Sequence, residues 1–390
     1  MTRSFCLAIA LSALPALAFA QQSSVFTTRG ISWSPTLTLQ EFGWDSNIEN
    51  APANPVSDMT ATVKPGADAS VNLAHAKLSG AALLELVYYD QSTRDRAFNR
   101  RLNGRAEFPL NALTPYVAFA QQGAKDRPTP EVDTPQRHSD LDVNAGASVP
   151  VSSRVAIQFA GRRQTTTYDK EAIVRGVSAA TALDYRQLGA TVGVRIALTP
   201  LTSLGIDLQR MRATYPLSPL KTDESSASHV SLEFAPDAVI RGHAGIGWHK
   251  QTSRDLALLP YNGVVFDVDL GYVLLDVTRI TGRYNKDTAV SVEAPYYVST
   301  AYGLDVSQAF VGPTELIARY TRTNADYPGD LTRAITPRLD TLDIYGGGVA
   351  ILMGKGSRMT VTYEIAKRQS VLELLTYDRQ RLFTSFVLGL

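Results

Sequence analysis

Apolar residues occupy every second position along most of this chain, and this alternation constrains the fold more than any other feature. In the stretch VVFDVDLGYVLL (residues 264–275) the even positions are apolar or aromatic, whereas Asp267, Asp269 and Gly271 take the odd ones. The same two-sided pattern recurs in TSLGIDLQRM, LGATVGVRIAL and RMTVTYEIAK. Because a period of two is that of a β-strand with one buried face, the alternation predicts an all-β protein.

Turn signals separate these strands in two alternating classes. Short turns are predicted near residues 74–75, 111–115, 150–154, 198–202, 235–238, 275–276, 311–314 and 354–357. Longer polar connections lie between them, among them residues 124–139, 215–226 and 326–338. Short and long connections follow one another about every 20 residues, which divides the chain into about eighteen strands, with about sixteen as the fallback count.

Three all-β architectures compete for this pattern. Propeller blades also repeat at roughly 40 residues, but no signature motif recurs here and blades do not alternate short turns with long loops. A secreted sandwich would not need so many long strands with one uniformly apolar face. A single transmembrane antiparallel β-barrel of the outer-membrane type explains the apolar face and both classes of connection. It also closes the sheet, so no backbone edge is left unpaired in hydrocarbon.

The first twenty residues have the features of a secretory signal peptide. They combine Arg3, an apolar run and the small-x-small triplet at residues 18–20. Cleavage there removes Cys6, the only cysteine, and leaves residues 21–390 as the barrel domain with 37 basic and 37 acidic residues. This balance argues against nucleic acid as a partner. The expected location is the outer membrane of a Gram-negative cell, reached after cleavage of the signal peptide.

Charged residues test the assignment of faces, because Arg or Lys facing lipid at the midplane costs about 2–4 kcal/mol. Charges on the inward parity, which we expect to face the lumen, are Arg105, Glu107, Asp142, Arg162, Arg195, Asp207, Arg241, Asp267, Asp269, Arg279, Arg283, Asp305, Arg319 and Glu364. Glu107 and Arg279 apart, these are the candidates for contact with a solute. Arg210 and Arg212 take the lipid parity at the outer end of their strand, where head groups would tolerate them.

Aromatic and glycine residues give further expectations about the wall. Aromatic residues near strand ends, which fit interfacial girdles, are Trp33, Trp44, Tyr88, Phe108, Tyr168, Tyr215, Trp248, Tyr284 and Tyr363. The run Gly346–Gly348 shifts the parity of its strand and predicts a β-bulge or bend. In the last strand, Leu382, Phe386, Leu388 and Leu390 are expected to face lipid, and Arg381, Ser385 and Gly389 to face inward.

The sequence contains no motif of a known catalytic or cofactor site. It lacks G-x-S-x-G, H-E-x-x-H, a P-loop and C-x-x-C. The five histidines are scattered, and His243 and His249 stand about 20 Å apart along one strand, too far to bind one metal ion. We therefore expect neither an enzyme, nor a metal site, nor a cofactor.

Opposite charges on neighbouring strands form the best polar constellation. If the turns near Asp276 and Gly312 are tight, Asp269 faces Arg283 and Asp305 faces Arg319, and Asp207 lies near Arg195. One interpretation is that such pairs only satisfy the interior of a large barrel. The other is that they make a neutral, hydrogen-bonding conduit for an uncharged polar solute such as a glycan.

The stretch WSPTLTLQEFGWDSNIEN (residues 33–50) resembles the opening of an outer-membrane β-barrel family of the porin type that is often encoded with exopolysaccharide synthesis and secretion systems. That family begins P-x-L-x-L and reaches a D-[DS]-N-[IV] turn, matched here by Pro35, Asp45, Ser46, Asn47 and Ile48. The resemblance implies a component of polysaccharide export, with a periplasmic export protein and an inner-membrane copolymerase as partners, and no catalytic residues. Asp, Ser and Asn also favour a turn on their own.

The function expected from these features is export of an exopolysaccharide through a polar lumen, in contact with outer-membrane lipid and lipopolysaccharide. Two alternatives stay open. One is a general or substrate-specific porin for small solutes, and the other is a surface lectin or anchor for capsule. The aromatic residues of the predicted outer loops, Tyr215, Tyr261, Tyr296, Tyr297 and Tyr327, are few and near strand ends, which weighs against the lectin.

Overall fold

The chain forms one closed antiparallel β-barrel. The computed structural model describes residues 26–28, 30–132, 134–174, 176–255, 258–292, 294, 296–329, 336–354 and 356–389. The predicted signal peptide, residues 1–20, lies outside these ranges. Within them, β2 to β8 and β11 to β21 pair in chain order, and β21 pairs with β2, so that eighteen strands close the wall. The predicted fold class and strand number are therefore confirmed.

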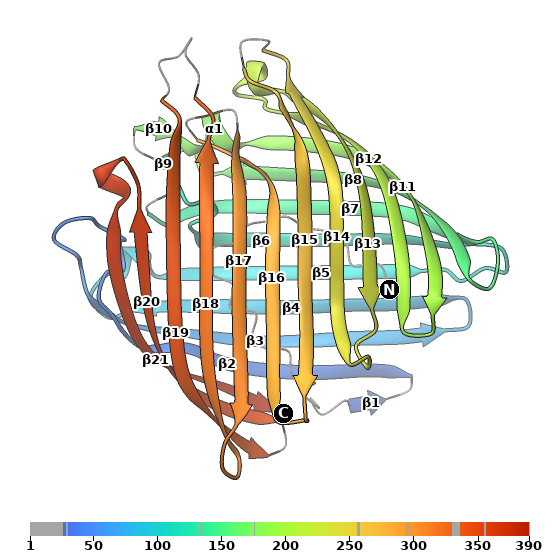
Figure 1. Cartoon of the computed structure of the whole chain (residues 1–390), viewed down its shortest axis with the longest axis horizontal. Helices are drawn as coiled ribbons and strands as arrows, with labels where there is room; N and C mark the ends of the chain where they lie inside the picture. Colours follow the sequence, from blue (N-terminus) through green and yellow to red (C-terminus); the bar gives the residue numbers. More distant parts are fainter. Residues whose placement is uncertain are drawn as a thin grey trace.

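The barrel strands are long, as a tilted membrane crossing requires. Their bounds are β2 Ile31–Asp45, β3 Asp58–Leu73, β4 Ala76–Tyr89, β5 Ala97–Glu107, β6 Thr114–Asp126, β7 Gln136–Pro150, β8 Val155–Tyr168, β11 Tyr185–Thr199, β12 Thr202–Thr214, β13 Asp223–Phe234, β14 Ile240–Ser253, β15 Tyr261–Leu274, β16 Thr278–Val290, β17 Tyr296–Ala309, β18 Thr314–Tyr327, β19 Arg338–Gly354, β20 Ser357–Gln369 and β21 Tyr377–Gly389. Figure 1 shows β13 to β19 as the near wall, with β2 to β8 crossing behind.

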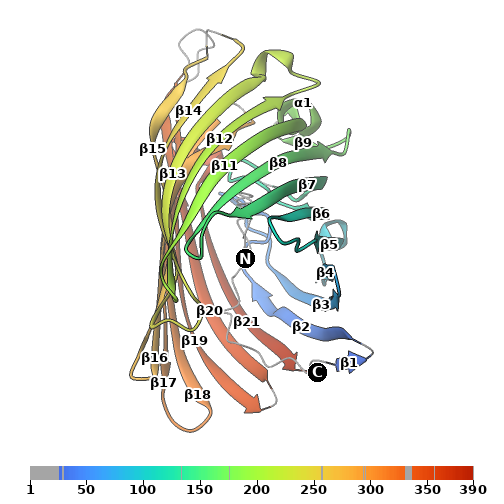
Figure 2. The same ribbon diagram turned by 90° about the vertical axis from the view of Figure 1, so that its right-hand side faces the viewer.

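Connections are short at one end of the barrel and long at the other (Figure 2). All eight predicted tight turns separate paired strands at the short-turn end. At the turn after β15, Leu275 and Asp276 have φ values of 50° and 57°, the left-handed conformation that tight hairpins use. The long-loop end holds the small elements β9 (Ile173–Val174), β10 (Val177–Ser178), α1 (Ala179–Leu183), η1 (Thr93–Asp95), η2 (Pro219–Lys221) and η4 (Glu373–Leu375). β1 (Phe26–Thr28) pairs with the start of β2.

The alternation of the sequence becomes an alternation of faces. On β12, Leu208 is 60% exposed, whereas its neighbours Asp207 and Gln209 are half-buried and face inward. Arg210 and Arg212 share the outward parity of Leu208 and are exposed. In the described part of the chain, no helix is both long and apolar enough to span a membrane.

The bulge predicted at Gly346–Gly348 is wrong. These glycines pair in unbroken register with β18 on one side and β20 on the other. Leu342, earlier on the same strand, is 8% exposed and packs inward at the long-loop end, against Ala366 and Tyr377. Leu342 is therefore apolar because it packs inside the barrel, not because it faces lipid.

A bulge that the sequence did not reveal lies in β2. The register of β2 with both neighbours shifts between Leu39 and Gly43, and Glu41 has a φ of 53°. The extra residue changes the parity, so Trp33 and Trp44 both face outward although one position is odd and the other even. Gly43 is needed there, because a Cβ would stand 2.1 Å from the Leu382 carbonyl oxygen.

Most of the predicted girdle is exposed, as expected. Trp33, Trp44, Tyr88, Phe108, Trp248 and Tyr363 are between 41 and 50% exposed. The ring of Tyr284 contacts that of Phe266 at a tilted angle, with the ring centres 5.4 Å apart. Tyr168 and Tyr215 were assigned wrongly, since both line the inner cavity described below and Tyr215 is only 2% exposed. Their apolar rings pack at the loop end inside the wall.

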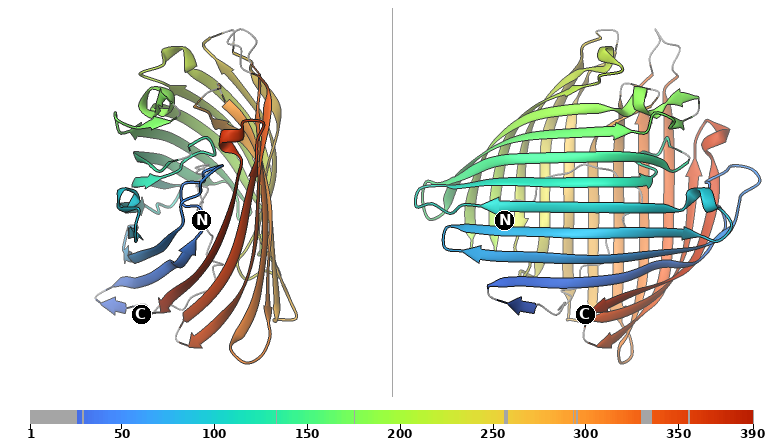
Figure 3. Two further views of the ribbon diagram at one scale, coloured as in Figure 1. Left: turned by 90° about the vertical axis from the view of Figure 1, so that its left-hand side faces the viewer. Right: turned by 180° about the vertical axis from the view of Figure 1, so that it is seen from behind.

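The last strand follows the predicted parity with one addition. Leu382 and Leu388 are 49% and 38% exposed, and the Arg381 side chain is paired inside the barrel. Phe383 faces inward and is 5% exposed, a role that the sequence did not assign. Leu390 lies outside the described residues. Figure 3 shows β21 beside β2, where the wall closes.

Candidate functional site: the polar lumen and its loop mouth

A cavity of about 1020 Å³ lies inside the barrel along β5 to β17. Its lining includes the predicted lumen residues Arg105, Asp142, Arg162, Arg195, Asp207 and Asp267. Amide and phenol side chains make up much of the rest: Gln122, Asn144, Gln158, Gln164, Gln187, Gln209, Gln251, Asn285, Tyr116, Tyr168, Tyr185 and Tyr215. The cavity therefore presents many neutral hydrogen-bonding groups.

Arg162 on β8 joins three strands of the cavity wall. Its Nε donates to the Asp142 carboxylate on β7 at 2.7 Å, and its Nη2 donates to Gln164 Oε1 at 3.1 Å. The amide of Gln164 in turn donates to the Tyr185 hydroxyl on β11 at 2.8 Å. The charge of the guanidinium is thus balanced locally.

Arg195 and Asp207 form a two-pronged pair across β11 and β12, with both N–O distances at 2.9 Å. Gly193 allows it, because a Cβ at Gly193 would stand 2.1 Å from the Asp207 Oδ1. Because the pair packs against Gly193, it occupies less of the volume of the lumen than two extended side chains would. The proximity predicted for Arg195 and Asp207 is confirmed.

On β15 to β18 the two predicted cross-strand pairs merge into one network. Asp269 pairs in register with Arg283, and their charged atoms are 3.4 Å apart. Asp305 pairs in register with Arg319, which donates to it at 2.7 Å, and Arg283 donates to the same carboxylate. The Asp305 side chain is 2% exposed, so its charge is compensated by two guanidinium groups. Asp267 on β15 contacts His243 at 2.7 Å.

The remaining candidates lie at the edges of the cavity or away from it. Arg105 donates to Glu107 at 2.6 Å and its guanidinium stands 4.0 Å from the centre of the Tyr116 ring. Arg241 is exposed near the short-turn end of β14. Glu364 is 4% exposed and paired with Arg381 on β21. Among the described residues, every candidate except Arg241 therefore has a partner of opposite charge, or His243 in the case of Asp267, inside the barrel.

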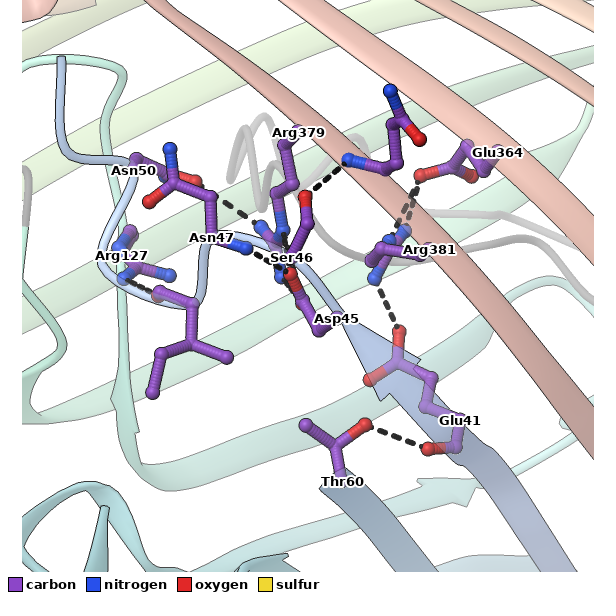
Figure 4. A network of polar contacts seen from close by, with 12 residues as sticks. Glu41, Asp45, Ser46, Asn47, Asn50, Thr60, Arg127, Glu364, Arg379 and Arg381 are labelled. Atoms are coloured by element: carbon purple, nitrogen blue, oxygen red, sulfur yellow. Dashed lines mark hydrogen bonds and ion pairs between the residues drawn. The ribbon is translucent and has the colours of Figure 1, made fainter. Parts of the chain in front are cut away.

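Charged pairs also join the first and last strands (Figure 4). Arg381 on β21 donates to Glu364 on β20 and to Glu41 on β2, both at 3.1 Å. The left-handed backbone at Glu41 turns its carboxylate toward this pair. Arg379 donates to both oxygens of Asp45 at 2.9 and 3.0 Å.

The motif residues Asp45, Ser46 and Asn47 lie at the long-loop end of this seam (Figure 4), and Ile48 follows them in the first long loop. The backbone N–H of Asn47 donates to Asp45 Oδ1 at 3.0 Å. The Asn47 side chain donates to the Ala51 carbonyl and accepts from the Ala51 backbone N–H. Ser46 Oγ accepts from the Gln380 backbone at 2.8 Å. These contacts build a turn anchored to β21. Pro35 lies earlier on β2, paired with Ala67 of β3. Contact of these residues with a solute stays a prediction.

The loop between β6 and β7 folds into the mouth at the long-loop end, which we call the loop mouth. Glu131 is fully buried and accepts hydrogen bonds from the Ser291 hydroxyl at 2.8 Å and from the Val292 amide. Arg338 on β19 lies 3.5 Å from the same carboxylate, and Arg368 on β20 donates to Pro130. A single loop is thus tied to the opposite wall of the barrel.

Arg127 lies in the same loop between β6 and β7 and links it to the first long loop. Its guanidinium donates to the Ile48 carbonyl, which links the loop to the motif turn. Burial and the nearby Arg379 lower the pKa of Arg127 below its ordinary value.

Sequence reasoning missed the loop mouth. Tyr297 and Tyr327 are 0 and 1% exposed and stack at 5.1 Å, and Tyr261 and Tyr296 are 9% and 7% exposed. The sequence placed these tyrosines near loop bases, where an inward side chain cannot be told from an outward one. The only available signal was Val132, an apolar residue in a polar loop.

A closed eighteen-stranded barrel with an apolar outer face and a polar, charge-paired lumen defines a porin-type β-barrel membrane protein. The model of the family described as "Putative beta-barrel porin 2" matches residues 34–388, and the chain belongs to that family. This confirms the barrel-porin part of the resemblance seen at the N-terminus. Its association with exopolysaccharide stays a prediction.

Solved structures share the fold at low sequence identity. OpdK of Pseudomonas aeruginosa, crystallised with vanillate, is 10% identical with a TM-score of 0.50, and the alignment covers 91% of this chain and 98% of OpdK. The siderophore receptor PirA of Acinetobacter baumannii is 8% identical with a TM-score of 0.47, and the alignment covers 87% of this chain and 63% of the receptor. No curated protein is significantly similar to the chain.

Proposed function

We propose that this barrel lies in the outer membrane of a Gram-negative cell and is a diffusion channel for polar, largely uncharged solutes. The observation that carries the proposal is the cavity of about 1020 Å³, whose amides and phenols face the lumen while its charges bind one another. A charged solute would have to compete with these internal pairs. Neutral hydroxyls can hydrogen bond to the amides directly.

Glycans are the solute class that fits this lining best. Gln164 and Gln187 are register partners on β8 and β11 and line the same cavity. Two neighbouring amides offer donors and acceptors together, as successive sugar hydroxyls require. The channel needs no catalytic residue for this role.

Export of an exopolysaccharide is the narrower form of the proposal. It rests on the resemblance of Pro35 and residues 45–48 to the family motif, and a periplasmic export protein and a copolymerase would be its partners. The lectin alternative loses support, because Tyr215, Tyr297 and Tyr327 are nearly inaccessible.

Conductance and swelling measurements test the channel. Purified protein in planar bilayers should give ion conductance, and proteoliposomes should swell in neutral sugars faster than in charged analogues of equal size. The variant Q164L/Q187L should slow sugar entry, whereas Thr165→Val, on β8 and absent from the cavity lining, should not. A wild-type barrel that admits neither ions nor sugars would contradict the channel.

Deletion of the gene tests the narrower proposal. Loss of secreted polysaccharide, restored by the wild-type gene, would support export. Unchanged secretion in a strain whose protein forms sugar-permeable channels in vitro would leave a porin for small solutes as the function.

A further inference from the structure

Five positively charged side chains of β8 and β11 to β14 stand on the outward face of the barrel, close to the long-loop end. They are Arg163 on β8, Arg186 on β11, Arg210 and Arg212 on β12 and Lys250 on β14. All five are exposed and share the parity of the apolar residues on their strands. We call these five residues the outward cationic patch.

Strand register makes the patch continuous. Arg163 on β8 and Arg212 on β12 flank β11, and both have Leu188 of β11 as their register partner. Arg210 and Lys250 likewise share one partner on β13. Because neighbouring strands stand about 4.8 Å apart, the backbones within each pair are roughly 10 Å apart. The patch thus spans neighbouring strands from β8 to β14, which Figure 1 shows side by side at the upper right.

The charge of the patch is not balanced by the barrel. Every residue of β8 and β11 to β14 is described, and Glu224 is the only acid at their outward positions. Glu224 binds Arg210 at 3.2 Å. Glu224 is also the register partner of Arg212, so one acid on these strands faces two of the five cations, and Arg163, Arg186 and Lys250 have no outward acid as register partner.

Another part of the outer wall shows how the barrel neutralises an outward cation. On β18 and β19, Arg322 donates to Asp343 through Nε at 2.6 Å and Nη2 at 2.8 Å. The Tyr320 hydroxyl donates to the same carboxylate at 2.9 Å. Outward charge is thus paired within the wall there, in contrast to the patch.

An apolar surface begins directly beside the patch. Leu208 and Trp248 are 60% and 50% exposed and stand two residues before Arg210 and Lys250. Two residues along a strand span about 6.7 Å. A partner that fits both surfaces has anionic groups bonded to apolar chains a few ångströms away.

We propose that the outward cationic patch binds the phosphate groups of a phosphorylated glycolipid of the surrounding leaflet, whose acyl chains cover the adjoining apolar rows. Arg and Lys bind phosphate through charge-assisted hydrogen bonds, and these are strengthened at the edge of the hydrocarbon. This inference rests on the outer-membrane location proposed above, but it concerns the outside of the barrel and not the channel.

The test compares lipid binding by variants in detergent micelles. Native mass spectrometry titrates the full barrel with bisphosphorylated lipid A, with the same glycolipid after dephosphorylation, and with phosphatidylglycerol. The variant R163Q/R212Q/K250Q should bind bisphosphorylated lipid A roughly 100-fold more weakly than wild type. The control R100Q/R137Q/K367Q removes three exposed cations elsewhere on the barrel and should bind as wild type does.

Three results would overturn the proposal. They are equal affinity of the patch variant and wild type, equal affinity for the dephosphorylated glycolipid, and equal affinity for phosphatidylglycerol. Sugar entry into proteoliposomes separates this proposal from the channel. The patch variant should admit sugars as fast as wild type does, so weaker lipid binding by this variant tests the patch alone. Failure of the wild-type barrel to admit sugars would contradict the channel and leave the patch proposal untouched.

Discussion

Arg379 on the last strand and Asp45 at the end of β2 form an ion pair across the barrel seam, although 334 residues separate them in sequence. Asp45 is 3% exposed and also organises the turn that begins the first long loop. No covalent turn joins β21 to β2, so the strand hydrogen bonds, this pair and the bonds of Ser46 and Asn47 to β21 hold the seam at the long-loop end.

We expect Asp45→Ala to lower the free energy of unfolding by about 3–5 kcal/mol, because it leaves a largely buried guanidinium without its carboxylate. Urea unfolding in detergent micelles, followed by tryptophan fluorescence, measures the change. The control Asp378→Ala removes an exposed carboxylate from the neighbouring β21 position. The double variant D45A/R379A should lose less than the sum of the two single variants. Additive losses would mean that the pair makes no coupled contribution.

Glu131 holds the inward loop at the mouth, so Glu131→Ala should release it. We expect a larger single-channel conductance, because the loop loses its bonds to Ser291 and Val292 on the opposite side. Recordings in planar bilayers measure this. Glu373→Ala is the matched control, since Glu373 is an exposed acid of another loop. Equal conductance of Glu131→Ala and wild type would show that the loop does not restrict the pore.

The sequence left open whether the charge pairs serve solute passage or only the wall, and the conduit interpretation predicts that neutralising Arg283 and Arg319 alters solute passage more than barrel stability. Burial of Asp305 between these arginines now favours the wall. Neither arginine lines the large cavity. We expect R283Q/R319Q to lower the free energy of unfolding by about 3–5 kcal/mol and to leave sugar permeation unchanged. Altered permeation at unchanged stability would instead support the conduit role.

Gly193 provides the space for the Arg195 and Asp207 pair. Gly193→Ala should lower stability by about 1–3 kcal/mol, because the new Cβ would meet the Asp207 carboxylate and force it into the lumen. Gly282→Ala is the control, since a Cβ at that strand position meets nothing within 4 Å. Thermal unfolding and sugar permeation of both variants measure the effect. Equal behaviour of the two variants would show that the wall adjusts at Gly193.

The strand count and the turns could be predicted because they follow from local chemistry. Period-two alternation and turn residues act over a few neighbours, and the lipid penalty on charges fixes which parity faces outward. The same rule correctly paired Asp269 with Arg283 and Asp305 with Arg319, since a tight turn fixes the register of its hairpin.

Apolar and aromatic residues near the long-loop end could not be assigned to the inner or outer face in this way. Leu342, Tyr168 and Tyr215 are apolar or aromatic, yet they face inward, because the loop mouth has an apolar interior of its own. The alternation rule treats every apolar side chain near a strand end as lipid-facing and therefore fails there.

The sequence by itself determined an all-β barrel of about eighteen strands with its charges inside, because hydrocarbon excludes open sheet edges and unpaired charge wherever the strands cross. Only the tertiary structure decided the loop mouth and the seam. Glu131 reaches Ser291, and Asp45 reaches Arg379, across sequence separations of 160 and 334 residues. Such contacts depend on closure of the whole barrel, so no local pattern in the chain encodes them.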